Sequence, residues 1–166
     1  MFRITNTHCG TSGFTMTEML VVVVLLGVAG AVAIPQFSGN SAQYAQTAAR
    51  SISQDIQYAQ DLAVTTQSPI TLSIPSGYEY SLEDIWGTTL THPVNRKPFS
   101  VNFQDDPGIS QLTITADFGG ATKVVFDAFG TPSTGGTITL SHPSMTSNVV
   151  LTLHAATGSV TVSRAP

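Results

Sequence analysis

The chain is poor in charged residues and has a single cysteine. Charged side chains make up 10% of its 166 residues, against roughly 25% in an average protein, so neither a disordered acidic chain nor a coiled coil fits. One cysteine, Cys9, excludes an intrachain disulfide and a zinc site built on cysteines. The net charge of −4 argues against a surface that attracts phosphate groups. The length predicts one compact domain with an appended segment.

Serine and threonine are abundant instead, with 17 and 23 copies, and the remaining charges are unevenly placed. No charged residue lies between Glu18 and Arg50, and within this gap Met19 to Ile34 are all apolar or glycine. As a helix, this run would rise about 24 Å, and the wider segment from Phe14 to Phe37 about 36 Å, against a hydrocarbon core of about 30 Å. The sequence therefore predicts a membrane-spanning helix over residues 14–37.

Two other interpretations of the apolar run remain open at this point. Four consecutive valines favour β structure locally, so the run also fits a buried strand or core helix of a soluble protein. A positive Arg3 before an apolar stretch also fits a secretory signal peptide, cut near Ala33. Glu18 argues against the signal peptide, because a carboxylate in hydrocarbon costs about 2.5 kcal/mol or more and usually has a partner. A carboxylate facing lipid headgroups is the simpler alternative for Glu18.

The residues around Glu18 read Gly13-Phe14-Thr15-Met16-Thr17-Glu18-Met19-Leu20, followed by the apolar run and Pro35. This segment resembles the N-terminus of type IV pilins and type II secretion pseudopilins. The resemblance implies that a prepilin peptidase cuts between Gly13 and Phe14 and methylates the new N-terminus. It also implies a cleaved leader over residues 1–13, inner-membrane lipid around residues 14–37, and a periplasmic head.

The resemblance assigns roles to two further residues. Glu18 of an incoming subunit is expected to meet the N-terminal amine of a neighbour, because an unpaired charge in a dry environment is costly. Pro35 is expected to kink or locally melt the helix, because proline lacks an N–H and clashes with the carbonyl four residues before it. Other pilins or pseudopilins are the implied partners.

Residues 38–66 have the pattern of an amphipathic helix that ends near Val64. Small and branched apolar residues recur there at spacings of three and four, namely Ala49, Ile52, Ile56, Ala59 and Ala63. Beyond Pro69 the period changes to two, which predicts a β-rich head over residues 67–166. A hairpin is expected at Ile70–Leu82 and a loop at Glu83–Pro98. Further strands are expected at Phe99–Phe103, Gln111–Ala116, Lys123–Phe126, Gly136–Leu140, Val149–His154 and Ser159–Ser163.

The sequence thus predicts an α+β fold, with a long N-terminal helix packed on an antiparallel β-sheet head, as in pilins. The order of helix, immediate hairpin, Val125–Pro132 and a final strand after Thr157-Gly158 resembles the GspH/FimT group of minor pseudopilins and minor pilins. The resemblance implies a non-enzymatic structural subunit of a type II secretion or type IV pilus system. As an alternative, some FimT-like minor pilins bind DNA during transformation through basic residues near the C-terminus. Here that tail carries one cation, Arg164, so nucleic acid is not the expected partner.

No catalytic residue, cofactor or metal site is predicted. His92 and His142 each precede a proline, which indicates turns, and His154 is expected on a strand. The acidic pairs Glu83-Asp84 and Asp105-Asp106 are candidate calcium ligands, but they lack the twelve-residue spacing of an EF-hand and suit solvated turns.

Overall fold

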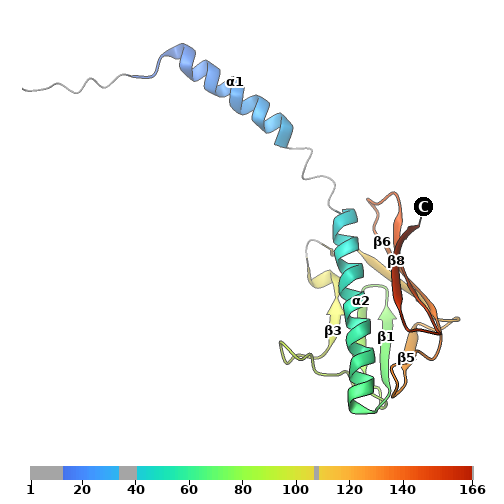
Figure 1. The fold of residues 1–166 in the computed structure, drawn as a ribbon. Helices are drawn as coiled ribbons and strands as arrows, with labels where there is room; N and C mark the ends of the chain where they lie inside the picture. Colours follow the sequence, from blue (N-terminus) through green and yellow to red (C-terminus); the bar gives the residue numbers. More distant parts are fainter. Residues whose placement is uncertain (1–12, 34–40, 107–108, 166) are drawn as a thin grey trace, which may run out of the picture. The chain divides into compact units, whose positions relative to one another are not determined.

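A computed structural model describes residues 13–33, 41–106 and 109–165 of the chain (Figure 1). The chain divides into two compact units, Met1–Gly39 and Asn40–Pro166. The second unit, named the head, contains all the strands found in the described residues and one long helix.

The first unit contains helix α1, Met16–Ala33. Thr15 caps it, because its hydroxyl accepts a hydrogen bond from the backbone N–H of Glu18 at 3.3 Å. Glu18 lies in the first turn, where a carboxylate interacts favourably with the helix dipole. Among the helices of the described ranges, none is both long enough and apolar enough to cross a membrane. The segment that the sequence predicts to span the membrane, residues 14–37, includes residues 34–37, which lie outside the described ranges.

Helix α2, Ser41–Thr66, is amphipathic, as the spacing of its apolar residues predicts. The predicted stripe is buried, and Ala45 and Ala48 extend it toward the start of the helix. The exposed residues Arg50, Gln54, Gln57 and Asp61 occupy other faces. At the C-terminal end, Gln67 adopts a left-handed φ of 52°, which stops the helix. The helix therefore continues two residues past the predicted end near Val64.

Eight strands follow, and all of them lie close to the predicted ranges. They are β1 (Ile70–Ser76), β2 (Glu79–Glu83), β3 (Ser100–Asn102), β4 (Thr113–Asp117), β5 (Lys123–Phe126), β6 (Gly136–Ser141), β7 (Asn148–Leu153) and β8 (Val160–Ala165). A short 3₁₀ helix, η2, covers Phe103–Asp105. The alternating burial of β7 puts Val149, Leu151 and Leu153 in the core, as the pattern predicts.

The strands form two antiparallel sheets, of order β3-β2-β1-β5 and β4-β6-β7-β8. Helix α2 contacts strands of both sheets, so one apolar stripe covers the core that the sheets share (Figure 1). In the first sheet, β1 pairs with β2 on one side and with β5 on the other. Glu83 at the end of β2 and Phe126 at the end of β5 therefore flank the start of β1.

Candidate functional site

The residues predicted to be processed precede α1. Gly13 and Phe14 are not in a helix, and the Phe14 side chain is 71% exposed. A Cβ built on Gly13 meets no atom within 4 Å. Glu18 lies one turn further on and is also exposed. Three of the four predicted site residues, Gly13, Phe14 and Glu18, lie in this short described segment. The fourth, Pro35, lies outside the described residues.

Helix α1 exposes large apolar side chains along its length. They include Met16, Leu20, Val23, Leu25, Leu26 and Val28. A helix that is apolar on all sides is stable only where a nonaqueous partner covers it. The apolar area of α1 therefore calls for a nonaqueous partner, whether lipid or protein.

In the head, a carboxylate of α2 and a phenol of β2 form a partly buried pair. The Tyr80 hydroxyl donates a hydrogen bond to Asp55 Oδ2 at 2.5 Å. Burial raises the pKa of Asp55 above its usual 3.8, although the hydrogen bond from Tyr80 and the nearby His92 act in the opposite direction. Burial and the neighbouring Asp55 carboxylate raise the pKa of Tyr80 strongly. The hydrogen bond offsets part of the cost of burying these two polar groups.

Tyr80 also lines a groove of about 350 Å³ between α2 and the β2–β3 side of the head. The other lining residues are Tyr44, Thr47, Ala48, Ser51, Val101, Phe103, Asp106 and Ile109. The groove is mostly apolar and open to solvent, which suits packing against another surface better than catalysis of a reaction.

The three histidines of the head take part in local structure. The Nδ1 atoms of His92 and His142 accept hydrogen bonds from the N–H groups of Val94 and Ser144, which makes each one a turn residue, as predicted. His154 follows β7 rather than ending it, and its Nε2 lies 2.7 Å from Thr161 Oγ1 on β8. The prediction that His154 lies on the strand is wrong by one residue, because the hairpin turn begins there.

The acidic pairs considered for calcium lie at the ends of regular elements, Glu83-Asp84 at the end of β2 and Asp105-Asp106 at the end of η2. Asp84 Oδ1 accepts hydrogen bonds from the N–H groups of Trp86 and Thr88, so backbone donors occupy that oxygen. Asp105 ends η2. Within the described part of the chain, no three His, Cys, Asp or Glu residues gather closely enough to hold a metal ion.

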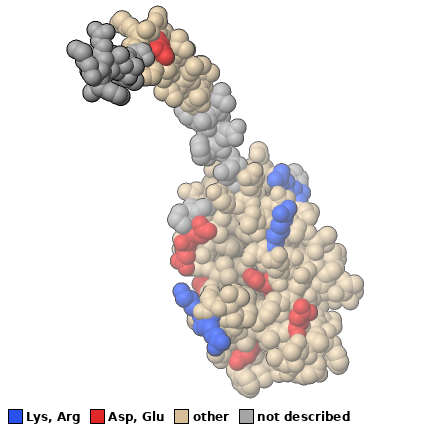
Figure 2. All heavy atoms as spheres, turned by 60° about the vertical axis from the view of Figure 1, so that its left-hand side comes forward, with Lys and Arg blue, Asp and Glu red and all other residues tan. Residues whose placement is uncertain are grey.

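The cations of the head are dispersed. Arg50 lies on α2, Arg96 and Lys97 are neighbours in the β2–β3 loop, Lys123 begins β5, and Arg164 lies on β8. On the face seen in Figure 2, the Lys and Arg side chains lie in small groups at opposite parts of a mostly uncharged surface. Phosphate binding needs several cations on one face, and this face does not provide such a cluster.

Two stabilising features have no counterpart in the sequence predictions. One is the Asp55–Tyr80 pair; the other is Gln60, whose Nε2 donates to the carbonyls of Gly130 at 3.3 Å and Gly158 at 3.0 Å. Gln60 thereby ties two loops of different sheets to α2. In the sequence, each feature is indicated only by a polar residue of α2 next to the buried stripe, Asp55 for the first and Gln60 for the second.

One helix packed on two antiparallel sheets is the architecture of a pilin head, and comparison with solved structures supports this. The type IV minor pilin FimU of Pseudomonas aeruginosa is 21% identical with a TM-score of 0.55, and the match covers 76% of this chain and 96% of that one. The minor pseudopilin EpsH of the type 2 secretion system of Vibrio cholerae is 11% identical with a TM-score of 0.57, covering 72% and 96%. At these identities the likeness shows the fold.

The family follows from the sequence itself. A model of the family described as type II transport protein GspH matches residues 48–163, which is more than half of the chain. The chain belongs to the GspH family, whose members are structural pilin-like subunits and not enzymes. A comparison with curated proteins finds no match.

Proposed function

We propose that this protein is a minor pseudopilin or minor pilin that joins the tip or priming complex of a type II secretion pseudopilus or a type IV pilus. The observation that carries the proposal is the exposed apolar helix α1 in a chain whose pilin-type head buries a complete core without it. A helix that is apolar on all sides provides the surface that a subunit needs in order to insert into lipid and assemble.

Processing precedes assembly in this proposal. A prepilin peptidase removes residues 1–13 and methylates the amine of Phe14. The exposure of Gly13 and Phe14 supports this, because a peptidase needs an accessible peptide bond. Residues 14–37 then hold the subunit in inner-membrane lipid with the head in the periplasm. The charge-free sequence from Met19 to Ile34 supports this step.

Glu18 and Pro35 act during assembly. Glu18 pairs with the N-terminal amine of a neighbouring subunit, and its position one turn after Phe14 puts both groups at the same end of α1. Inside a bundle of apolar helices, such a pair offsets the cost of burying either charge. Pro35 interrupts helical hydrogen bonding between the apolar run and α2.

Mass spectrometry of the N-terminus in cells with a prepilin peptidase tests the processing step. We expect a chain that begins with methylated Phe14. An intact Met1, or a cut near Ala33, would contradict it. Deletion of the peptidase is the control and should leave the leader in place.

Crosslinking to neighbouring pilins tests the role of Glu18. Glu18→Gln, which keeps the size of the side chain and removes the charge, should leave membrane insertion intact and abolish most crosslinks. The matched control is Asp61→Asn, an exposed carboxylate on α2. If Glu18→Gln enters the filament as readily as Asp61→Asn, Glu18 has no role in assembly.

DNA capture, the alternative suggested by the FimT likeness, is disfavoured by the scattered cations. A gel shift with the full chain at low salt separates the two functions. Tight binding that weakens steeply with salt would favour DNA capture.

A further inference from the structure

The two sheets have four edge strands, and three of them are protected from pairing with another chain. On the outer side of β5, the Ser133 N–H donates to the carbonyl of Val125 at 2.7 Å. On the outer side of β4, the Ile114 N–H donates to the carbonyl of Gly77 at 2.8 Å. The edge strand β3 is only three residues long. Covering an edge and shortening it are two ways in which proteins prevent unwanted strand pairing.

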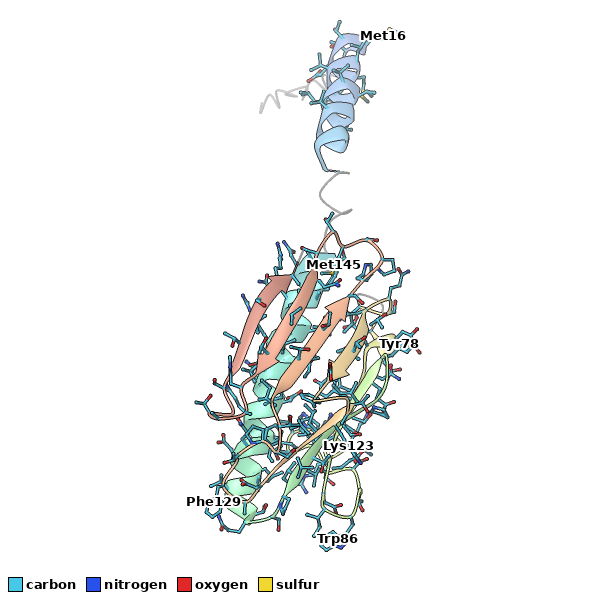
Figure 3. The ribbon with its side chains drawn as sticks, turned by 90° about the vertical axis from the view of Figure 1, so that its right-hand side faces the viewer. Met16, Tyr78, Trp86, Lys123, Phe129 and Met145 are labelled. Carbon is cyan, nitrogen blue, oxygen red and sulfur yellow. The ribbon has the colours of Figure 1, made fainter. Side chains whose placement is uncertain are left out.

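The fourth edge strand, β8, is long and open. It has six residues, and its register with β7 runs from Val160 to Ala165 without a bulge. Among the backbone hydrogen bonds and bridges between described residues, none joins the outer side of β8 to another segment. Figure 3 shows this last strand of the chain at the margin of its sheet. The strand therefore offers a regular, unblocked edge.

The turn before β8 shows which backbone groups point away from β7. The His154 N–H donates to the Ser159 carbonyl at 3.0 Å, so these two residues form a hydrogen-bonded pair. Hydrogen-bonded and non-hydrogen-bonded pairs alternate along an antiparallel ladder, so the next pair, which contains Val160, is not hydrogen-bonded. The same holds for the pairs that contain Val162 and Arg164. The N–H and C=O groups of these three residues therefore point to the open side.

The side chains of the same three residues lie on the core-facing side of the second sheet, because each is directly opposite a buried residue of β7. Val162 lies opposite Leu151, which is 1% exposed, yet Val162 itself is 38% exposed. Arg164 is exposed as well. The core therefore ends before the outer side of β8, and an apolar residue in the middle of the strand stays in contact with water.

An identical strand in antiparallel orientation fits this edge. With a two-fold axis at Val162, this residue pairs with Val162 of the second copy, and Val160 pairs with Arg164 of the second copy. Each of these pairs exchanges two N–H···O bonds, because all three residues have their backbone groups on the open side. On the other face of the sheet, Thr161 lies opposite Ser163 of the second copy, and such hydroxyl pairs stabilise neighbouring strands.

Arg164 selects this register over its neighbours. With the axis at Val162, the two arginines lie four residues apart along the strands, at least about 13 Å, which exceeds the screening length of about 8 Å at physiological salt. With the axis at Arg164, the two cations would face each other directly, which is unfavourable. With the axis at Val160, the paired segment would include the turn residue Gly158, whose φ of 65° is not that of a strand. One register thus uses the whole strand and separates the charges.

We propose that β8 pairs in antiparallel orientation with β8 of a second copy of this chain. The four-stranded second sheets of two heads then become one continuous sheet, and the contact is isologous, with Val162 meeting itself at the axis. The paired strands are only about 20 Å long, so the interface belongs to the small class below about 1,200 Å² and the dimer is weak. The contact does not involve α1, so it goes beyond the proposed function.

Sedimentation equilibrium of the full chain in a density-matched detergent tests the pairing. We expect a monomer–dimer equilibrium for the parent chain. Val162→Lys should stay monomeric where the parent is mostly dimeric, because two cations would meet at the axis. Val64→Lys is the matched control and should dimerise like the parent, because Val64 is 45% exposed but lies on α2.

Two results of this measurement would overturn the proposal. The first is a parent chain that stays monomeric up to about 1 mM, the range of very weak complexes, which would leave the edge to a strand of another protein. The second is a Val162→Lys variant that dimerises like the parent, which would show that the chains associate through another surface such as α1.

A charge exchange at the axis tests whether Val162 meets itself. Val162→Glu alone should be monomeric, like Val162→Lys. An equimolar mixture of the two variants should associate about tenfold more tightly than either variant alone, because opposite charges then face each other across the strands. A mixture that associates no more tightly than the separate variants contradicts this register and the proposal with it.

Amide hydrogen exchange, measured by NMR on the parent chain, shows whether the backbone edge itself takes part. The N–H groups of Val160, Val162 and Arg164 should exchange several times more slowly as the protein concentration rises, because the second strand accepts their hydrogen bonds. The N–H groups of Thr161 and Ser163, which face β7, serve as internal controls and should change little. Exchange of the three outward groups that does not depend on concentration would exclude pairing through β8.

Discussion

The two helices of this chain use apolar residues in opposite ways. Helix α1 exposes them along its length, whereas α2 buries a narrow stripe and exposes polar residues on its other faces. The partner of α2 is part of its own chain, since both sheets pack against it. In the proposed function, the partner of α1 is lipid or a neighbouring subunit. On this proposal, the stability of the head and the capacity to assemble reside in different segments of the chain.

The largest expected effect is at the buried stripe of α2. Ile56 has 0% exposure, and Ile56→Ala should lower the free energy of unfolding of the head by about 2–5 kcal/mol, because it leaves a cavity in a packed core. Urea unfolding followed by far-UV circular dichroism measures this change. A loss below about 1 kcal/mol would mean that α2 is not an essential part of the core.

The next effect is at the polar pair that joins α2 to β2. Tyr80→Phe should cost about 1–3 kcal/mol, because the Asp55 carboxylate loses its donor while it stays partly buried. The same unfolding measurement applies. Tyr78→Phe, on an exposed side chain of the same hairpin, is the control and should change little.

A smaller effect concerns pH. Because burial raises the folded-state pKa of Asp55 above 3.8, the folded head holds this proton to a higher pH than the unfolded chain does. The stability from Asp55 is therefore complete below about pH 3.8 and is lost as the pH rises through the folded-state pKa. Asp55→Asn should remove this loss, so its stability relative to the parent chain should increase from pH 4 to pH 7. If the unfolding free energies of Asp55→Asn and the parent chain change in parallel over this pH range, burial does not raise the pKa of Asp55.

The smallest effect on the stability of the head is expected for a substitution in α1. Leu25 is 62% exposed, and Leu25→Ala should change the unfolding free energy of the head by less than about 0.5 kcal/mol. The same substitution should weaken membrane retention, measured by carbonate extraction. A destabilised head would show that the two helices do not divide the roles as proposed.

Much of the fold could be predicted because its signals are local. The stripe at Ile52 and Ile56 has the helical period, and the alternation of Val149, Leu151 and Leu153 has the strand period. Each pattern depends on residues within a few positions of one another. The boundaries of α2 and of the strands therefore lie close to the predicted ones.

The remaining features join residues that are distant in the sequence. Asp55 meets Tyr80 across 25 positions, and Gln60 meets Gly158 across 98. Period-two alternation shows that a segment is a strand but not which strand it pairs with, so the division into two sheets had no local signal. The pattern Asp-x-aromatic-Gly-Thr occurs twice in the sequence, at residues 84–88 and 127–131. The sequence does not show that both copies lie at the same end of the first sheet.

By itself, the sequence determined where helices and strands occur and which residues precede α1, because hydrophobic period, capping and turn residues act over short distances. Only the tertiary structure decided that β2 and β5 flank β1, and so put Trp86 and Phe129 at one end of the head. The physical reason is that strand pairing depends on burial and hydrogen bonding summed over the whole core.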